Sequence, residues 1–124
     1  MEFSNPAFRQ PPVDAYGDGG FRVDGKRVEG SLLLLPARME PWPLADLNDA
    51  SIRSFDPLVA LKNDFDVLLI GCGKTMTFLP KVIRDHLSEH GISFDVMTTP
   101  AACRTYNILA SEDRPVAGAF IAVD

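Results

Sequence analysis

Residues 68–75 read LLIGCGKT, an apolar run that ends in a Gly-x-Gly turn and continues with Lys-Thr. Two classes of nucleotide-binding protein end a buried strand in this way, the phosphate-loop NTPases and the dinucleotide-binding folds. The first class needs a glycine where this chain has Leu68, because the backbone must wrap the phosphates. The second needs a third glycine where the chain has Met76. Both motifs fail, and the stretch is predicted to be a buried strand that runs into a tight turn.

Strands and helices alternate on either side of this turn. Short apolar runs predict strands at residues 31–35, 66–70, 92–97 and 116–123. Helical spacing and capping residues predict helices at residues 54–63, 80–90 and 100–110, and a proline-rich loop is expected at residues 36–47. Alternation of this kind is typical of a sheet covered by helices on both faces. The sequence therefore predicts an α/β fold, a three-layer α/β/α single domain with a central mixed, mostly parallel sheet.

The N-terminal part of the chain has a different character. Residues 1–18 contain three prolines among polar residues and show neither helical nor strand periodicity, which predicts a flexible N-terminal arm. Residues 21–28 then alternate apolar and polar side chains around Asp24-Gly25, a strong hairpin signal. We therefore expect one domain over residues 19–124 that begins with a β-hairpin.

Composition limits the class of function. The chain carries a formal net charge of −5, which disfavours nucleic-acid binding because phosphate contacts need a positive surface. No apolar run approaches the roughly 18 residues of a membrane helix, and the N-terminus shows no secretory signal. The sequence thus predicts a cytoplasmic protein without membrane insertion, whose two cysteines stay reduced.

The glycine turn is the first candidate for a binding site. In an open parallel sheet the loops at the carboxyl ends of the strands form a crevice, and glycines there let backbone N–H groups face a small anion. Arg104, on a predicted helix beside this crevice, is suited to hold a carboxylate or phosphate. The candidate ligand-binding residues are Gly71, Cys72, Gly73, Arg104 and Asn107. The alternative is that the glycines only turn the chain and the polar side chains tie neighbouring loops.

The two cysteines are candidates for thiol chemistry. Cys103 is predicted in the first turn of a helix beside Arg104, where the helix N-terminus and the cation favour thiolate. Cys72 lies at the end of a predicted strand, so the two sulfurs are candidates to share one rim of the sheet. The alternative is that both are small buried hydrophobic side chains.

A histidine pair and a tryptophan complete the candidates. His86 and His90 are spaced to share one helix face, as two imidazole ligands would, but no third ligand is evident, and the sequence predicts no metal site. Trp42 lies between two prolines. It is either an exposed anchor for a partner protein or a plug for the edge of the sheet.

Several of these stretches together resemble a known family. The glycine turn, the Pro41-Trp42 pair, residues 98–109 (TTPAACRTYNIL) and the Arg-Pro-Val at 114–116 resemble the small α/β domain family that includes the mitochondrial complex I assembly factor 3 and the adipogenesis-associated domain protein, with many uncharacterised bacterial members. The resemblance covers about residues 20–123. Recurring family positions are occupied by Thr99, Ala102, Thr105, Tyr106, Asn107 and Arg114. Cys72 departs from the usual Gly-Thr-Gly turn.

The resemblance implies a fold and a broad function. It implies a three-layer fold with a mixed sheet, in which the final strand is a candidate to run antiparallel, and it implies no reaction. Its eukaryotic members imply a role in assembling membrane-bound respiratory enzymes through protein contacts, in mitochondria. We therefore expect a non-enzymatic protein-binding domain without catalytic residues or cofactors. The alternative is a small-molecule or anion binder, or an enzyme, that uses the crevice at the Gly71-Cys72-Gly73 turn.

Overall fold

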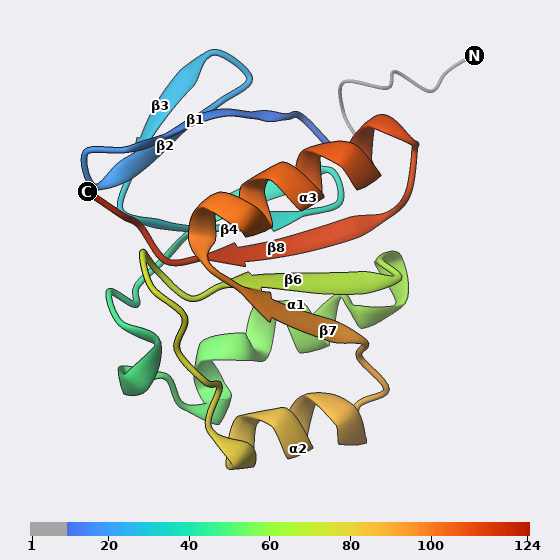
Figure 1. Ribbon diagram of the computed structural model, residues 1–124. Helices are drawn as coiled ribbons and strands as arrows, with labels where there is room; N and C mark the ends of the chain where they lie inside the picture. The colour runs from blue at the N-terminus through green and yellow to red at the C-terminus, as the bar shows by residue number, and fades with distance from the viewer. Residues whose placement is uncertain (1–9) are drawn as a thin grey trace.

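A five-stranded sheet forms the centre of the computed structural model, which describes residues 10–124 (Figure 1). Its strands lie in the order β5-β4-β8-β6-β7. Their bounds are Ser31–Leu35 for β4, Arg38–Trp42 for β5, Val67–Gly71 for β6, Phe94–Met97 for β7 and Val116–Phe120 for β8. Strands and helices are mixed along the chain, so the predicted α/β fold class is confirmed.

The directions of these strands correct one part of the prediction. β6 is parallel to β7 and to β8, whereas β4 is antiparallel to β5 and to β8. The sheet is therefore mixed, as expected, but only half of its neighbouring pairs are parallel. β4 is the reversed strand: a tight turn makes it antiparallel to β5, and it also pairs antiparallel with β8. The final strand, β8, runs parallel to β6 and is antiparallel only to β4.

The edge strand β5 lies in the segment where the sequence predicts a proline-rich loop. Its turn from β4 places Ala37 in the left-handed region, at φ 69°. Pro41 pairs opposite Leu32 inside the strand. A proline has no N–H to donate, so it fits a strand only where one side is unpaired, which is the case at a sheet edge. The prolines that suggest a loop are compatible with this particular strand.

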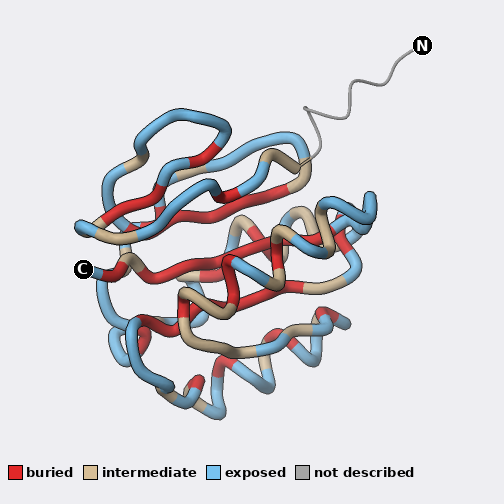
Figure 2. The backbone as a smooth tube through the Cα atoms, turned by 45° about the horizontal axis from the view of Figure 1, so that its top comes forward, coloured by how far each residue is buried: buried red, intermediate tan, exposed pale blue. Residues whose placement is uncertain are grey.

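Both faces of the sheet are covered (Figures 1 and 2). One face packs against α3 (Thr99–Ser111) and a small sheet of β1 (Val13–Gly17), β2 (Gly20–Val23) and β3 (Lys26–Glu29). The other packs against α1 (Asp56–Ala60), α2 (Lys81–Glu89) and the 3-10 turns η2 (Leu47–Asp49) and η3 (Ile52–Phe55). A further 3-10 turn, η4 (Lys62–Asp64), has no buried residue. In β4, Leu32 and Leu34 join the first core, and Leu33 and Leu35 join the second. Alternate side chains of a strand point to opposite faces, which explains the unbroken leucine run.

The segment predicted as a single helix at residues 54–63 is divided in the structure. A 3-10 turn leads into the five residues of α1, and a second 3-10 turn follows it. Asn63 and Asp64 lie where the helix would have continued, and short polar side chains of this kind compete for backbone hydrogen bonds. The helices at residues 80–90 and 100–110 are confirmed, with each of the four boundaries shifted by one residue.

The N-terminal arm predicted for residues 1–18 is corrected over its second half. Residues 1–9 lie outside the described residues, but residues 13–17 form β1, which pairs antiparallel with β2. The side-chain oxygen of Asn107 in α3 accepts from the Val13 N–H at 2.8 Å, and its amide donates to the Val13 carbonyl at 2.9 Å. This distant contact is invisible to local periodicity. The hairpin expected around Asp24-Gly25 is confirmed as β2 and β3.

The Asn107 contact yields a test of how β1 is held. We expect Asn107→Ala to leave both backbone groups of Val13 without their partner and to lower the free energy of unfolding by about 1–2 kcal/mol. In this variant the backbone amides of β1 should exchange with deuterium faster than they do in the wild type, whereas those of β6 should keep their wild-type rates. Arg104→Ala, on the exposed side of the same helix, is the control and should change neither quantity. Unchanged exchange in β1 of the Asn107 variant would show that strand pairing alone holds it.

Candidate functional site

The glycine turn after β6 is shaped by close approach of the chain to itself. A Cβ atom on Gly71 would lie 2.9 Å from the Thr99 hydroxyl oxygen and 3.2 Å from a ring carbon of Phe120. Gly73 has a φ of 115°, in the region that side chains other than glycine rarely adopt. Both glycines are therefore required by the path of the backbone. This requirement holds whether or not a ligand binds.

The N–H groups of the turn are already hydrogen-bonded within the protein. Cys72 donates its N–H to the Met97 carbonyl at 2.8 Å, and Gly73 donates its N–H to the Thr99 hydroxyl at 3.0 Å. The Thr99 hydroxyl in turn donates to the Ile121 carbonyl at 2.7 Å. These two amides consequently point into the fold, which matches the alternative in which the glycines turn the chain.

A cavity of about 230 Å³ lies beside this turn. Its lining includes Cys72 and Gly73, together with Lys74, Thr75 and Thr77 of the following loop. Asp46 and Asn48 close it from the other side, with Ala45, Ile121 and Ala122 also in its wall. The lysine and threonines were missed as site residues because the Lys-Thr pair has no role once the nucleotide motifs fail. Their place directly after the turn was the available signal.

The five candidate ligand-binding residues are not brought together at this cavity. Gly71 is buried and does not line the cavity, and Asn107 is used to hold Val13. Arg104 is exposed on α3 and does not line the cavity. Binding of a small anion through the glycine turn and Arg104 stays a prediction.

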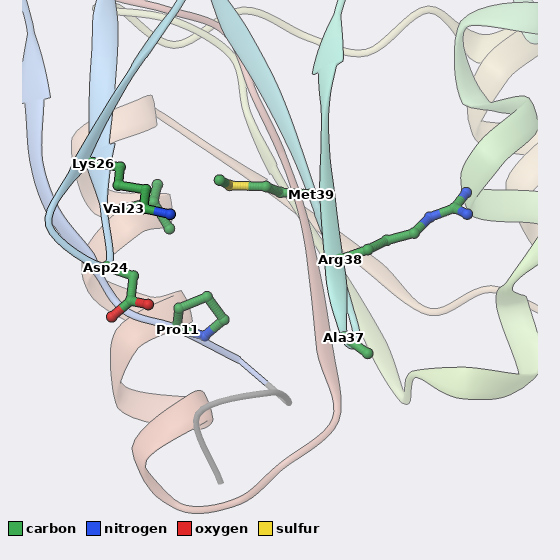
Figure 3. A pocket seen from close by; sticks show the side chains of 7 residues that line it. All are labelled: Pro11, Val23, Asp24, Lys26, Ala37, Arg38 and Met39. Atoms are coloured by element: carbon green, nitrogen blue, oxygen red, sulfur yellow. The ribbon is translucent and has the colours of Figure 1, made fainter. Parts of the chain in front are cut away.

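A second cavity, of about 390 Å³, opens between the small sheet and the edge of the large one (Figure 3). Met39 of β5 points across it toward Val23 and Lys26, whereas Arg38 points away (Figure 3). Pro11, Asp24 and Ala37 complete its lining. One wall belongs to the hairpin that the sequence predicts, but sequence reasoning missed the cavity because the opposite wall, residues 37–39, falls in the segment predicted as a proline-rich loop. Its mainly apolar wall is suited to an apolar group.

Comparison with known proteins fixes the family. The model of a family described as protein of unknown function (DUF498/DUF598) matches residues 13–121. The chain belongs to this family. The resemblance drawn from the glycine turn and residues 98–109 is thereby confirmed.

Two relatives and one solved structure show what the family contains. The chain is 33% identical over 109 residues to NADH dehydrogenase [ubiquinone] 1 alpha subcomplex assembly factor 3 of Danio rerio, covering 88% of this chain but 63% of that protein. An uncharacterised protein of Rhodobacter capsulatus is 35% identical over 113 residues, covering 89% of this chain and 83% of its own. A crystal structure described as an outer membrane protein from Bartonella henselae has a TM-score of 0.88 at 35% identity, covering 94% and 98% of the two chains.

In this family member the cysteines lie on opposite faces of the sheet. Cys72 belongs to the core under α1 and α2, and Cys103 to the core under α3. The predicted pair on one rim is therefore wrong, because β6 and α3 place the two side chains in separate cores. The Cys72 sulfur accepts the Thr77 N–H at 3.2 Å. Burial raises the pKa of the Cys103 thiol to about 12, outweighing the Arg104 guanidinium, which lowers it.

Trp42 is a plug at the sheet edge and not an exposed anchor. Only 3% of the side chain is exposed, and its indole N–H donates to the Ser54 carbonyl at 2.9 Å. Its ring meets Phe55 edge-on, with centroids 5.6 Å apart. It ends β5 and joins the core on the face that packs against α1. Of the two roles left open by the sequence, the structural one is observed.

The histidine pair shows the expected spacing. The rings of His86 and His90 lie 4.6 Å apart between centroids, at 70° to one another. Within residues 10–124, no group of three or more His, Cys, Asp or Glu side chains is placed to hold a metal ion. The same part of the chain contains no helix long and apolar enough to cross a membrane.

The buried Cys103 thiol predicts a pH dependence of stability. Between pH 9.0, its ordinary pKa, and about pH 12, the unfolded chain gives up the thiol proton while the folded chain keeps it. The unfolded state then binds fewer protons, so the free energy of unfolding falls as pH rises, by up to about 1.4 kcal/mol per pH unit. Below pH 9.0 this contribution is constant.

Urea unfolding of wild type and Cys103→Ala at pH values below and within this window measures the effect. The variant should lose less stability with rising pH than the wild type. Burial also raises the pKa of Tyr106, but this residue is present in both proteins. If the free energy of unfolding falls equally with pH in the two proteins, Cys103 does not titrate as a buried thiol.

Proposed function

We propose that this chain is a non-enzymatic protein-binding domain that acts in the assembly of respiratory or other membrane-bound complexes. The observation that carries the proposal is its 33% identity, over 88% of the chain, to a protein named as an assembly factor of NADH dehydrogenase. A second relative of the same name, from Bos taurus, is 34% identical over the same share of the chain. The chain spans only about three-fifths of the length of these relatives. That it shares their whole activity is therefore part of the proposal.

The geometry of the glycine turn supports binding in preference to chemistry. Its buried N–H groups are bonded to Met97 and Thr99, and the pKa of the Cys103 thiol is raised far above neutrality. Asn107 fastens β1. With the exception of the exposed Arg104, the groups that the sequence put forward for ligand or thiol chemistry thus contribute to the fold. An assembly factor needs none of them to react, only a stable surface that a partner recognises.

The proposal includes a place of action. A bacterial relative is 35% identical over 89% of this chain, which supports a bacterial member of the family, and the proposal places that member in the cytoplasm beside the membrane. There it would bind a subunit of a respiratory complex before or during its incorporation. The eukaryotic relatives are named for the alpha subcomplex of NADH dehydrogenase, which supports a subunit of that enzyme as the first partner to examine.

Deleting the gene for this chain in its own organism tests the proposed function. We expect a severalfold loss of fully assembled NADH dehydrogenase on native gels, with a matching loss of NADH oxidation by membranes. A plasmid copy of the wild-type gene should restore both. The Asn107→Ala copy, which weakens the fold, should restore them less well. Normal amounts of assembled enzyme in the deletion strain would contradict a role in its assembly.

A further inference from the structure

A group of exposed apolar side chains lies in the loop between β6 and α2 and in the first turn of α2. The exposed fractions are 53% for Met76, 86% for Phe78 and 59% for Val82, all within seven consecutive residues. Exposed hydrophobic residues scattered singly are ordinary, whereas a group of large ones on one short segment marks an interaction surface. Phe78 is the extreme case, since almost none of its ring is covered by the described part of the chain.

The loop is held in place, so the exposure of these side chains is not caused by a detached segment. Leu79 and Ile83, between and after the exposed residues, are buried at 2% and 0%. The Thr77 N–H donates to the Cys72 sulfur at 3.2 Å, and the Arg84 side chain donates to the Leu79 carbonyl at 3.1 Å. The backbone on both sides of Phe78 is therefore anchored. A fixed backbone presents the ring outward at low entropic cost to a partner.

The segment that carries these residues is basic although the whole chain is acidic. Residues 67–84 contain Lys74, Lys81 and Arg84 and no Asp or Glu, in a chain of net charge −5. Lys81 pairs with Asp85 at 2.6 Å. Lys74 and Arg84 form no ion pair with any residue in 10–124. Asp46, which shares a cavity with Lys74, accepts a hydrogen bond from the Asn48 N–H.

We propose that Met76, Phe78 and Val82, together with the cations of Lys74 and Arg84, form the surface on which this domain binds a partner protein. The partner segment is acidic and presents apolar side chains, because those are the groups that match an apolar cluster with cations beside it. We call these five residues the docking loop. The inference rests on the proposed function for the existence of a partner and adds where the partner binds and what its chemistry is.

An anionic membrane would also match an aromatic ring beside cations, but charge favours a protein. Electrostatic membrane binding takes clusters of roughly four to eight basic residues, and the docking loop offers only its lysine and its arginine. A molecule of net charge −5 is repelled as a whole from an anionic surface. A short acidic segment meets only the local positive charge and avoids most of that repulsion.

A random peptide library displayed on phage, selected against the whole chain, tests the docking loop directly. We expect the enriched peptides to carry net negative charge and two or more large apolar residues. Phe78→Ser should weaken binding of the synthetic peptides by at least about tenfold, because one central aromatic residue often dominates an interface. Lys74→Glu combined with Arg84→Glu should weaken it as well and reduce its dependence on salt.

Ile108→Ser is the matched control, since Ile108 of α3 is 58% exposed, close to the 59% of Val82, but lies outside the docking loop. It should leave peptide binding unchanged. Because Phe78 and Ile108 are exposed, circular dichroism and thermal midpoints of their variants should stay near wild type. Arg84→Glu also removes the hydrogen bond to the Leu79 carbonyl, so Lys74→Glu alone separates the loss of charge from a loosening of the loop. A selection that yields no acidic apolar peptides, or peptides that bind the Phe78 variant equally well, overturns the proposal.

Two further arms separate the proposal from its alternatives. Sedimentation with phosphatidylglycerol vesicles that depends on Phe78 would assign the loop to a membrane and overturn a protein partner. A gene copy carrying Phe78→Ser that fully restores the deletion strain would overturn the docking loop while leaving the proposed function standing. Conversely, peptide binding that depends on Phe78, in a chain whose deletion leaves assembly normal, would support the docking loop and contradict the proposed function.

Discussion

The hydroxyl group of Thr99 connects three separate segments of this domain. It accepts the N–H of Gly73 and donates to the carbonyl of Ile121, while the Thr99 N–H donates to the Gly73 carbonyl. One side chain thus joins the turn after β6, the first residue of α3 and the segment after β8. The residue is completely buried, so losing any of these bonds would leave a polar group without water or partner. Gly71 permits the arrangement because a Cβ atom there would strike Thr99.

These hydrogen bonds argue against the glycine turn as the functional site. Backbone amides in a glycine turn bind anions only when they are free to point at them. Here the amides of Cys72 and Gly73 are already bonded to Met97 and Thr99. The turn therefore has a structural role, although its sequence resembles a ligand site. The loop that leaves the turn has the opposite character. Its backbone is anchored through Cys72, but it exposes Phe78, an arrangement that suits contact with another protein.

Local patterns in the sequence were sufficient for much of the fold. The four leucines of β4 predict a strand buried on both faces, and Pro80 with Gly91 correctly bounds α2, because burial and capping depend on neighbouring residues. Strand β5 could not be predicted, since the effect of Pro41 depends on whether the strand lies at an edge. Strand β1 depends on Asn107, which is 94 residues distant. The directions of the strands likewise follow from tertiary pairing.

At the candidate site, too, local features could be predicted from the sequence and features that depend on tertiary contacts could not. Sequence reasoning correctly excluded the nucleotide motifs from Leu68 and Met76, and correctly identified both glycines as residues of a turn. It could not determine where the Gly73 N–H points, because the acceptor lies 26 residues away on another element. It also could not detect Phe78 as exposed, since a phenylalanine before Leu79 and Pro80 has the sequence character of a core residue. Exposure is a property of the packed molecule.

The amide signal of Gly73 in a nitrogen–hydrogen NMR spectrum tests the central claim most directly. If Thr99 holds this N–H, the signal should exchange slowly with deuterium and should not shift when inorganic phosphate is added. The amide of exposed Lys74 in the same spectrum provides the internal reference for a solvent-facing group. A Gly73 amide that exchanges as fast as that of Lys74, and that shifts saturably with phosphate, would contradict the claim and identify the turn as an anion site.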